Sequence, residues 1–285
     1  MRILLTGATG QVGRELAALL QGHEVIAPDR AALDLADIAR VRDTVRAVRP
    51  ELIVNPGAYT AVDRAEEEEA LARTINADAP AALAEEARRL GVPLIHFSTD
   101  YVFDGTAGAP YTEDAATGPL NAYGRTKLAG ERAVAASGCI HLVLRTSWVY
   151  SRHGRNFLLT IERLAREKSK LAVVADQFGT PNWSRDLARA VVNLAQRSRD
   201  ELSAKSGIYH LSSKGQTTWH GFATAIVESM RLDRPPEVAP IATSEFRTAA
   251  ERPAYTVLDS SRLAQCFGIV LPRWEDGLRE CQGQS

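Results

Sequence analysis

The chain opens with an apolar run that passes directly into three glycines and then into a helical pattern. Residues 3–5 form the run, Gly7, Gly10 and Gly13 follow, and apolar residues then recur at helical spacing up to residue 20. A strand, a glycine turn and a helix in this order are typical of a dinucleotide site. Gly7 permits the tight turn, Gly10 lets the backbone approach a pyrophosphate, and Gly13 lets the helix pack close to the strand. Similar turns also occur in α/β proteins that bind no nucleotide.

The first half of the chain continues with alternating strands and helices. We expect strands at residues 24–27, 51–54, 92–97 and 140–145, and helices at residues 38–48, 70–90 and 121–137. This alternation predicts the α/β class, with a Rossmann-type doubly wound parallel sheet over residues 1–150. Beyond Tyr150 the pattern loosens. We therefore expect residues 151–285 to form mainly a smaller, mixed α/β substrate lobe, while some of these segments are free to return to the Rossmann sheet.

Composition excludes several other classes of protein. The 34 basic and 35 acidic side chains nearly cancel, so no nucleic-acid partner is indicated. Cys139, Cys266 and Cys281 are far apart and lack metal-ligand spacing, which fits a reducing compartment. No signal peptide is recognisable, and no uncharged apolar run approaches the roughly 18 residues of a membrane span. We expect a soluble, cytoplasmic protein with no membrane partner.

A polar pair, Asp29 and Arg30, follows the second expected strand. In a dinucleotide fold this position faces the adenine ribose, where an acid accepts the ribose hydroxyls and a base can hold a 2′-phosphate. The pair therefore favours NADPH, with NADH tolerated. For either residue alone, an ordinary polar loop explains the pattern equally well.

Groups suited to proton transfer follow the fourth expected strand. Ser98 and Thr99 end that strand, and Tyr123 and Lys127 stand one turn apart on the next helix. A nearby ammonium is expected to lower the pKa of a phenol from its usual value near 10. Tyr123 could then give a proton to a ketone oxygen that Thr99 also binds, while a nicotinamide gives a hydride to the carbon. The Tyr-Lys spacing alone arises often by chance, so the glycine turn and the Ser-Thr strand end are needed beside it.

With these motifs together, the sequence resembles the extended short-chain dehydrogenase/reductases, and within them the dTDP-4-dehydrorhamnose reductases. The matching stretches are residues 7–13, 55–63, 98–105, 123–127, 145–150, 176–181 and 209–223. The resemblance implies NADPH-dependent reduction of the 4-keto group of dTDP-6-deoxy-L-lyxo-4-hexulose to dTDP-L-rhamnose. It implies Thr99, Tyr123 and Lys127 as catalytic residues, with Lys127 also on the nicotinamide ribose.

The same resemblance implies the two binding sites. The cofactor site would comprise Gly7, Gly10, Gln11, Val12, Asp29, Arg30, Asp34, Leu35, Ala58, Tyr59, Thr60, Tyr123 and Lys127. The site for the nucleotide sugar would comprise Val62, Ser98, Thr99, Tyr101, Tyr123 and Trp148. For Trp148, a place in the apolar core is the competing interpretation.

The sequence departs from the pattern of these reductases at two places. Pro56-Gly57-Ala58 stands where relatives often have three alanines, so backbone contacts to the cofactor can differ there. Some relatives dimerise through Mg²⁺ held by carboxylates; Glu15 matches one ligand, but Arg185 stands where a second acid is expected. An arginine cannot ligate Mg²⁺. We therefore predict no metal, and a monomer or a metal-free homodimer.

Three other functions compete with reduction of this sugar. Related dehydratases carry a glutamate where this chain has Tyr101, which is too weak a base at neutral pH. A related sugar-nucleotide reductase or epimerase is disfavoured by the motifs without being excluded. The same fold also serves as a non-catalytic, nucleotide-binding regulatory subunit of methionine adenosyltransferase. The intact set of Thr99, Tyr123 and Lys127 favours turnover over binding alone.

Overall fold

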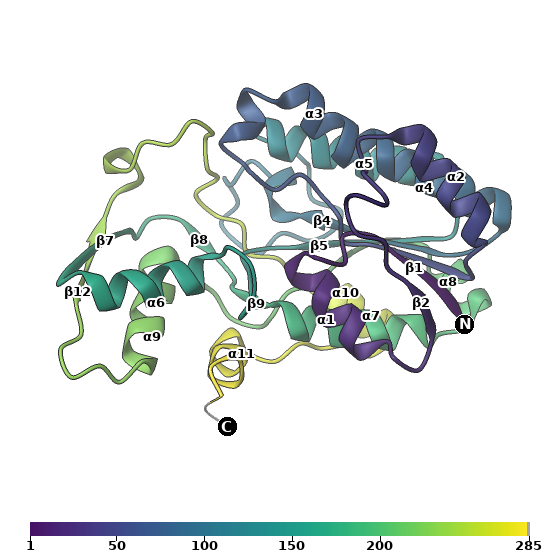
Figure 1. Ribbon diagram of the computed structural model, residues 1–285. Helices are drawn as coiled ribbons and strands as arrows, with labels where there is room; N and C mark the ends of the chain where they lie inside the picture. Colours follow the sequence, from purple (N-terminus) through teal and green to yellow (C-terminus); the bar gives the residue numbers. More distant parts are fainter. Residues whose placement is uncertain (284–285) are drawn as a thin grey trace.

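Parallel strands form the central sheet, in the order β10-β5-β4-β3-β1-β2 (Figure 1). The computed structural model describes residues 1–283. The strands are β1 (Arg2–Leu5), β2 (Glu24–Ile26), β3 (Leu52–Asn55), β4 (Leu94–Thr99), β5 (His141–Thr146) and β10 (Gly207–His210). Because β1 lies between β2 and β3, the strand order reverses at β1. Ligands of such sheets bind beyond the carboxyl ends of the strands at the reversal.

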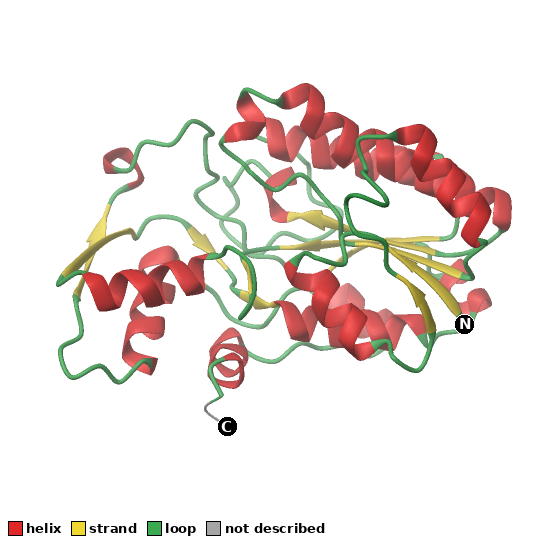
Figure 2. Ribbon diagram, in the orientation of Figure 1, coloured by secondary structure: helices red, strands yellow, loops and turns green. Residues whose placement is uncertain are grey.

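Helices cover both faces of the sheet, which confirms the predicted doubly wound α/β fold (Figure 2). One apolar cluster joins one face to α1 (Gln11–Leu19), α7 (Ser184–Ala195) and α10 (Ser261–Phe267). A second cluster joins the other face to α2 (Ile38–Val48), α4 (Ala79–Leu90) and α5 (Ala122–Ala136). Burial of these two layers fixes the sheet between the helices, since burial of apolar area is the main force that stabilises a fold.

The helix expected over residues 70–90 is interrupted. The structure has α3 (Glu69–Arg73), a π-helical turn (Thr74–Asp78) and then α4. Within the turn, the Asn76 side chain accepts a hydrogen bond from Tyr59 N and donates one to Tyr59 O, at 2.8 and 3.1 Å. The interruption thus ties the loop after β3 to the helical layer. Such π-helical turns are frequent at functional sites.

The second half of the chain contributes to both parts of the molecule. A lobe at the left of Figure 1 contains α6 (Phe157–Glu167), β7 (Lys170–Val174), α9 (Trp219–Ser229) and β12 (Glu237–Ile241), which share a third apolar cluster. The same cluster includes residues of β6 (Val149–Tyr150), β9 (Asn182–Trp183) and α11 (Trp274–Cys281), and β8 (Phe178–Gly179) pairs with β11 (Thr217–Thr218). By contrast, β10 pairs with β5, and α7 shares the apolar cluster of α1. The range 151–285 therefore also completes the first sheet.

None of the helices within residues 1–283 combines the length and apolarity needed to cross a membrane. The three cysteines are free thiols, of which Cys139 and Cys281 are buried and Cys266 is half-buried. Burial raises the pKa of the Cys139 thiol, so this group is a poor nucleophile at neutral pH.

Candidate active site

The glycine turn after β1 is closed by backbone contacts that leave no room for side chains. Gly7 has a φ of 58°, and its carbonyl accepts a hydrogen bond from Gly10 N at 2.9 Å. A Cβ atom on Gly13 would lie 2.1 Å from Gly7 O, well inside van der Waals contact. Only glycine fits at Gly7 and Gly13 without distortion of the backbone. The N–H groups at the start of α1 therefore remain available to an anion.

Gly57, part of the departure at Pro56-Gly57, lies where the turns after β1 and β3 meet. A Cβ atom on Gly7 would lie 2.6 Å from Gly57 Cα, so the turns after β1 and β3 touch each other. A Cβ atom on Gly57 would lie 2.7 Å from Leu35 Cδ1. A side chain at position 57 would therefore displace only the end of the Leu35 side chain, whereas a side chain at position 7 would meet the backbone of the neighbouring turn.

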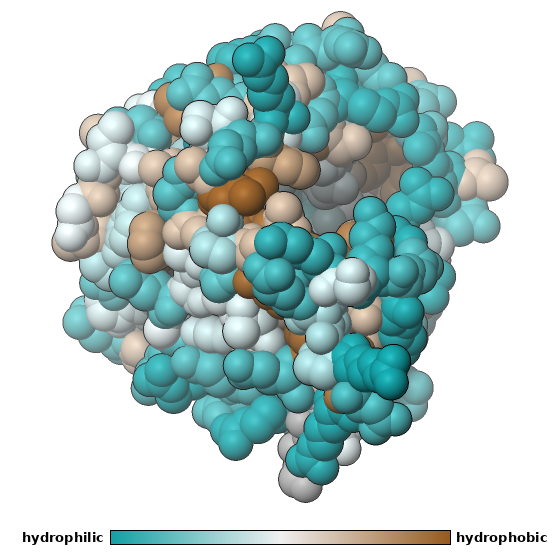
Figure 3. Space-filling model, turned by 90° about the vertical axis from the view of Figure 1, so that its left-hand side faces the viewer, coloured by the Kyte–Doolittle hydropathy of each residue, from teal (hydrophilic) through white to brown (hydrophobic). Residues whose placement is uncertain are grey.

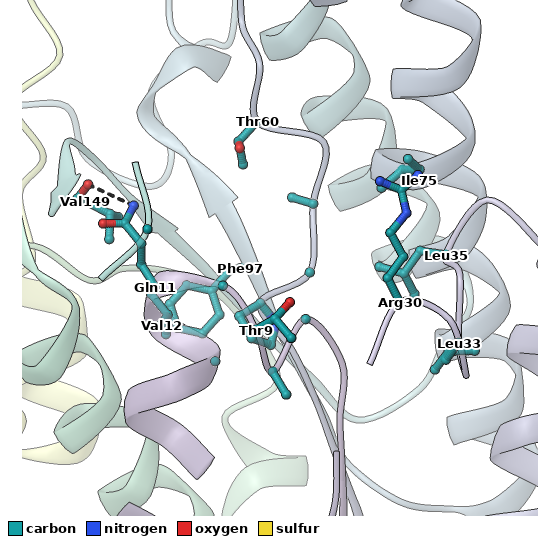
Figure 4. A pocket seen from close by; sticks show the side chains of 18 of the residues that line it. Thr9, Gln11, Val12, Arg30, Leu33, Leu35, Thr60, Ile75, Phe97 and Val149 are labelled. Carbon is teal, nitrogen blue, oxygen red and sulfur yellow. Dashed lines mark hydrogen bonds between the residues drawn. The ribbon is translucent and has the colours of Figure 1, made fainter. Parts of the chain in front are cut away.

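A cavity of about 440 Å³ lies beyond the carboxyl ends of β1, β3 and β4. In the close view, Arg30, Leu33 and Leu35 lie on the opposite side of this cavity from Gln11 and Val149 (Figure 4). The space-filling view from the lobe side shows that this face of the molecule is hollowed, with apolar groups in the walls (Figure 3). An elongated ligand could therefore span from the glycine turn to the loop after β2.

Most residues that the sequence assigned to a cofactor line this cavity. Those in its walls are Gly7, Gly10, Gln11, Val12, Arg30, Asp34, Leu35, Ala58, Thr60, Tyr123 and Lys127, together with Ser98 from the expected sugar site. The remaining expected residues, Asp29, Tyr59, Val62, Thr99, Tyr101 and Trp148, are not among its walls. Asp29 Oδ1 instead accepts a hydrogen bond from Ala32 N at 2.9 Å, which stabilises the loop that carries Arg30.

Arg30 and Asp34 form an exposed ion pair at the far side of the cavity. Arg30 Nε lies 3.3 Å from Asp34 Oδ2, and the Arg30 side chain is 75% exposed. A backbone hydrogen bond from Ala36 lowers the pKa of Asp34, and Arg30 lowers it further. The pair therefore presents a positive and a negative group side by side, and its net attraction is weak because water screens it.

Tyr123 and Lys127 project from α5 into the same cavity as the glycine turn. The N-cap Asn121 fixes this helix start, since its Oδ1 accepts a hydrogen bond from Gly124 N at 2.8 Å. Lys127 is only 2% exposed, and its Nζ donates to Phe97 O at 2.6 Å. The expected one-turn pairing of Tyr123 and Lys127 is thus present, with both side chains at the end of β4.

Thr99 lies beside Tyr123 at the end of β4. The Thr99 hydroxyl donates to Asp100 Oδ1 at 3.0 Å and accepts from Tyr101 N at 3.2 Å. The rings of Tyr101 and Tyr123 meet edge to face, with 5.8 Å between centroids. Strand β4, its following turn and α5 therefore bring together the expected catalytic residues and Tyr101.

The structure contradicts the expected lowering of the Tyr123 pKa. Burial raises the pKa of Tyr123 to about 12, against a smaller lowering by its hydrogen bond with Thr99. Burial also lowers the pKa of Lys127 to about 8, although Glu131 opposes this shift. Desolvation is the largest cause of both pKa shifts, because Lys127 is buried and Tyr123 is half-buried. In this state the phenol keeps its proton at neutral pH.

The loop after β6 contributes to the cavity and was missed in the sequence. His153, Gly154 and Arg155 line the cavity from this loop, and Gly154 has a φ of 72°. The loop is tied to α1, because Ser151 Oγ donates to Gln11 Oε1 at 3.0 Å and Gln11 Nε2 donates to Val149 O at 3.3 Å. The polar run at residues 151–155, directly after β6, was the available signal.

The expected metal position holds an ion pair within one chain. Arg185 Nε lies 3.7 Å from Glu15 Oε2. Within residues 1–283, no group of three or more His, Cys, Asp or Glu side chains is placed to hold a metal ion. The absence of an intersubunit metal stays a prediction.

The chain is similar to known proteins over its whole length. The family described as RmlD substrate binding domain matches residues 1–285. A dTDP-4-dehydrorhamnose reductase of Burkholderia thailandensis is 45% identical over 99% of this chain and 98% of its own length. Two crystal structures bearing that name have TM-scores of 0.93. The protein from Clostridium acetobutylicum is 39% identical, with 99% of both chains covered. The protein from Bacillus anthracis, in complex with NADP, is 34% identical, with 100% of this chain and 99% of that chain covered. The chain therefore belongs to the family of dTDP-4-dehydrorhamnose reductases.

Proposed function

We propose that this chain reduces the 4-keto group of dTDP-6-deoxy-L-lyxo-4-hexulose to give dTDP-L-rhamnose. The observation that carries the proposal is that Tyr123 and Lys127 line the same cavity as the glycine turn. The names of its relatives and the NADP in the Bacillus anthracis structure support the same reaction.

Tyr123 is the proton donor in this proposal. NADPH, when bound, would supply a hydride for the carbonyl carbon, and the carbonyl oxygen would then need a proton. With a pKa of about 12, the Tyr123 phenol is fully protonated at neutral pH and is still a stronger acid than an ordinary alcohol. To bind the substrate oxygen beside Tyr123, Thr99 would turn its hydroxyl hydrogen from Asp100 Oδ1 to that oxygen.

Lys127 stabilises the negative charge that remains on Tyr123 after proton transfer. Its hydrogen bond to Phe97 O keeps the ammonium under the carboxyl end of β4. With a pKa of about 8, the ammonium stays predominantly charged at neutral pH. In this proposal the same group also holds the ribose of the nicotinamide.

The remaining assignments follow the two sides of the cavity. The start of α1 would bind the pyrophosphate, and Arg30 would bind a 2′-phosphate, so NADPH is preferred and NADH is accepted. Val62, Ser98, Tyr101 and Trp148 would contact the nucleotide sugar. Asp34 would accept hydrogen bonds from the adenine ribose.

We also propose that the protein works as a monomer or as a metal-free homodimer. The Glu15–Arg185 ion pair supports this, because it occupies the carboxylate with a cation from the same chain. Sedimentation with Mg²⁺ and with a chelator tests it. A dimer that forms only with Mg²⁺ would overturn the proposal.

The reaction is tested by following NADPH oxidation with dTDP-6-deoxy-L-lyxo-4-hexulose, for the parent and for Tyr123→Phe. General acid catalysis contributes about 10²–10⁴-fold, and we expect the variant to lose activity by that factor. Both proteins should bind NADPH equally. A folded parent that binds NADPH but does not turn over would favour a different keto sugar or the regulatory-subunit function.

A further inference from the structure

Trp148 has a strained backbone that the surrounding structure holds in place. Its φ is 42°, in the left-handed region that bulky side chains seldom adopt. Asn182 clamps this turn, since Asn182 N donates to Trp148 O at 3.1 Å and Asn182 Nδ2 donates to Ser147 O at 2.7 Å. Strain of this kind costs free energy and persists mainly where a fixed geometry serves function.

The strained turn lies directly beside the candidate catalytic residues. Thr146, two residues earlier, is the register partner of Thr99 across β4 and β5. Thr146 and Val149 line the cavity described above, whereas Trp148 between them does not. The turn therefore directs the Trp148 side chain out of the cofactor cavity and toward the second lobe.

In the lobe, the Trp148 indole is enclosed on two sides. The Trp219 ring stacks on it with a centroid distance of 3.6 Å and an interplanar angle of 9°. From β8, a Cβ atom on Gly179 would lie 2.5 Å from Trp148 Cε2, so glycine is needed for the indole to fit. Trp219 is itself braced by Phe157, with ring centroids 4.7 Å apart. The slot formed by Gly179 and Trp219 fixes the orientation of the Trp148 ring.

We propose that Trp219 is a positioning residue, which holds Trp148 as a rigid wall against the sugar of the substrate. This inference rests on the proposed function, because it takes Trp148 as part of the sugar site. Neither ring needs to reorganise when substrate binds, because the conformational entropy of the two indole side chains is already lost during folding. Trp219 thereby links the packing of the lobe to recognition of the nucleotide sugar.

The alternative is that Trp219 only packs the lobe. Phe222 provides a matched control, since it lies on the same helix, is fully buried, and contacts Tyr150, Phe157 and Trp274 through its ring. Phe222→Leu weakens the lobe without removing the stack on Trp148. Gly179→Ala provides the complementary change, because it displaces Trp148 while Trp219 is intact.

Binding of dTDP-L-rhamnose and of NADPH is measured by calorimetry for the parent, Trp219→Leu, Gly179→Ala and Phe222→Leu. Loss of a well-stacked aromatic pair predicts roughly three- to tenfold weaker binding of the nucleotide sugar by Trp219→Leu and Gly179→Ala. We expect the KM for the keto sugar to rise in parallel, while NADPH binding stays unchanged. Phe222→Leu should lower the melting temperature and leave binding of the nucleotide sugar near the parent value.

Circular dichroism gives a readout that does not depend on activity. Two stacked indoles produce a coupled exciton signal, which Trp148→Phe and Trp219→Phe should each abolish. If the signal is lost but Trp219→Leu binds the sugar as Phe222→Leu does, the positioning role is overturned and the reductase proposal stands. A parent that binds no dTDP-L-rhamnose would overturn both.

Discussion

The Lys127 ammonium donates a hydrogen bond to the Phe97 carbonyl oxygen, 2.6 Å away, although Lys127 is almost fully buried. A side chain from the first half of α5 is thereby fixed to β4 near its carboxyl end. Because Thr99 ends the same strand, the Tyr123 phenol, the Lys127 ammonium and the Thr99 hydroxyl are held by only two elements, α5 and β4. Their relative positions depend on how α5 packs on the sheet.

Lys127→Met should abolish most of the activity and change how stability depends on pH. Burial lowers the folded-state pKa of Lys127 from 10.5 to about 8, so between these values the unfolded chain binds more protons. This lysine therefore destabilises the fold most below pH 8, and its cost fades as pH rises to 10.5. The free energy of unfolding that Lys127→Met gains over the parent should therefore be largest below pH 8. Denaturant unfolding at pH 7 and pH 10 tests this, with exposed Lys168→Met as the control.

Asp100→Asn should stabilise the protein more at pH 8 than at pH 5. Burial raises the pKa of Asp100 from 3.8 to about 7, against hydrogen bonds with Thr256 and Thr99 that lower it. The folded state then keeps a proton that the unfolded chain releases, so parent stability falls as pH rises from 3.8 to 7. Melting temperatures at both pH values provide the measurement. An equal difference at pH 5 and pH 8, as expected for exposed Asp43→Asn, would contradict the assigned shift.

Gly13→Ala should damage both stability and NADPH binding. The added Cβ atom would meet Gly7 O at 2.1 Å, so α1 must move away from the turn. Overpacking of this kind typically costs about 1–3 kcal/mol. Gly22→Ala is the matched control, because a Cβ atom there meets nothing within 4 Å. Thermal unfolding and NADPH titration should separate the two variants clearly; equal behaviour would exclude the steric argument.

Arg30→Ala should weaken NADPH binding while it leaves NADH binding nearly unchanged. The guanidinium lines the far side of the cavity and is mostly exposed, so we expect a loss of about tenfold rather than more. NADH serves as the internal control, since it lacks the 2′-phosphate. The loss should shrink as salt is raised, because screening weakens exposed charge pairs. A similar loss for both cofactors would indicate that Arg30 supports the loop instead.

Features that depend only on neighbouring residues could be predicted from the amino-acid pattern. Short apolar runs located the strands, the glycine spacing located the turn after β1, and the Tyr123–Lys127 spacing located a pair on one helix face. These patterns work because strand and helix periods are local properties of the chain. They were enough to predict the doubly wound sheet and the side of the sheet where the site lies.

Other features depend on contacts between distant segments and became visible only in the folded chain. The interruption of the helix at Asn76 follows from hydrogen bonds to Tyr59, and the return of β10 to the sheet follows from its pairing with β5. The pKa of Tyr123 rises because the folded chain removes water from the phenol, which no spacing in the sequence reports. Likewise, Trp148 leaves the cofactor cavity because Gly179 and Trp219 enclose it from far along the chain. Desolvation and packing are set by the whole fold, whereas the local pattern sets only which residues are available to it.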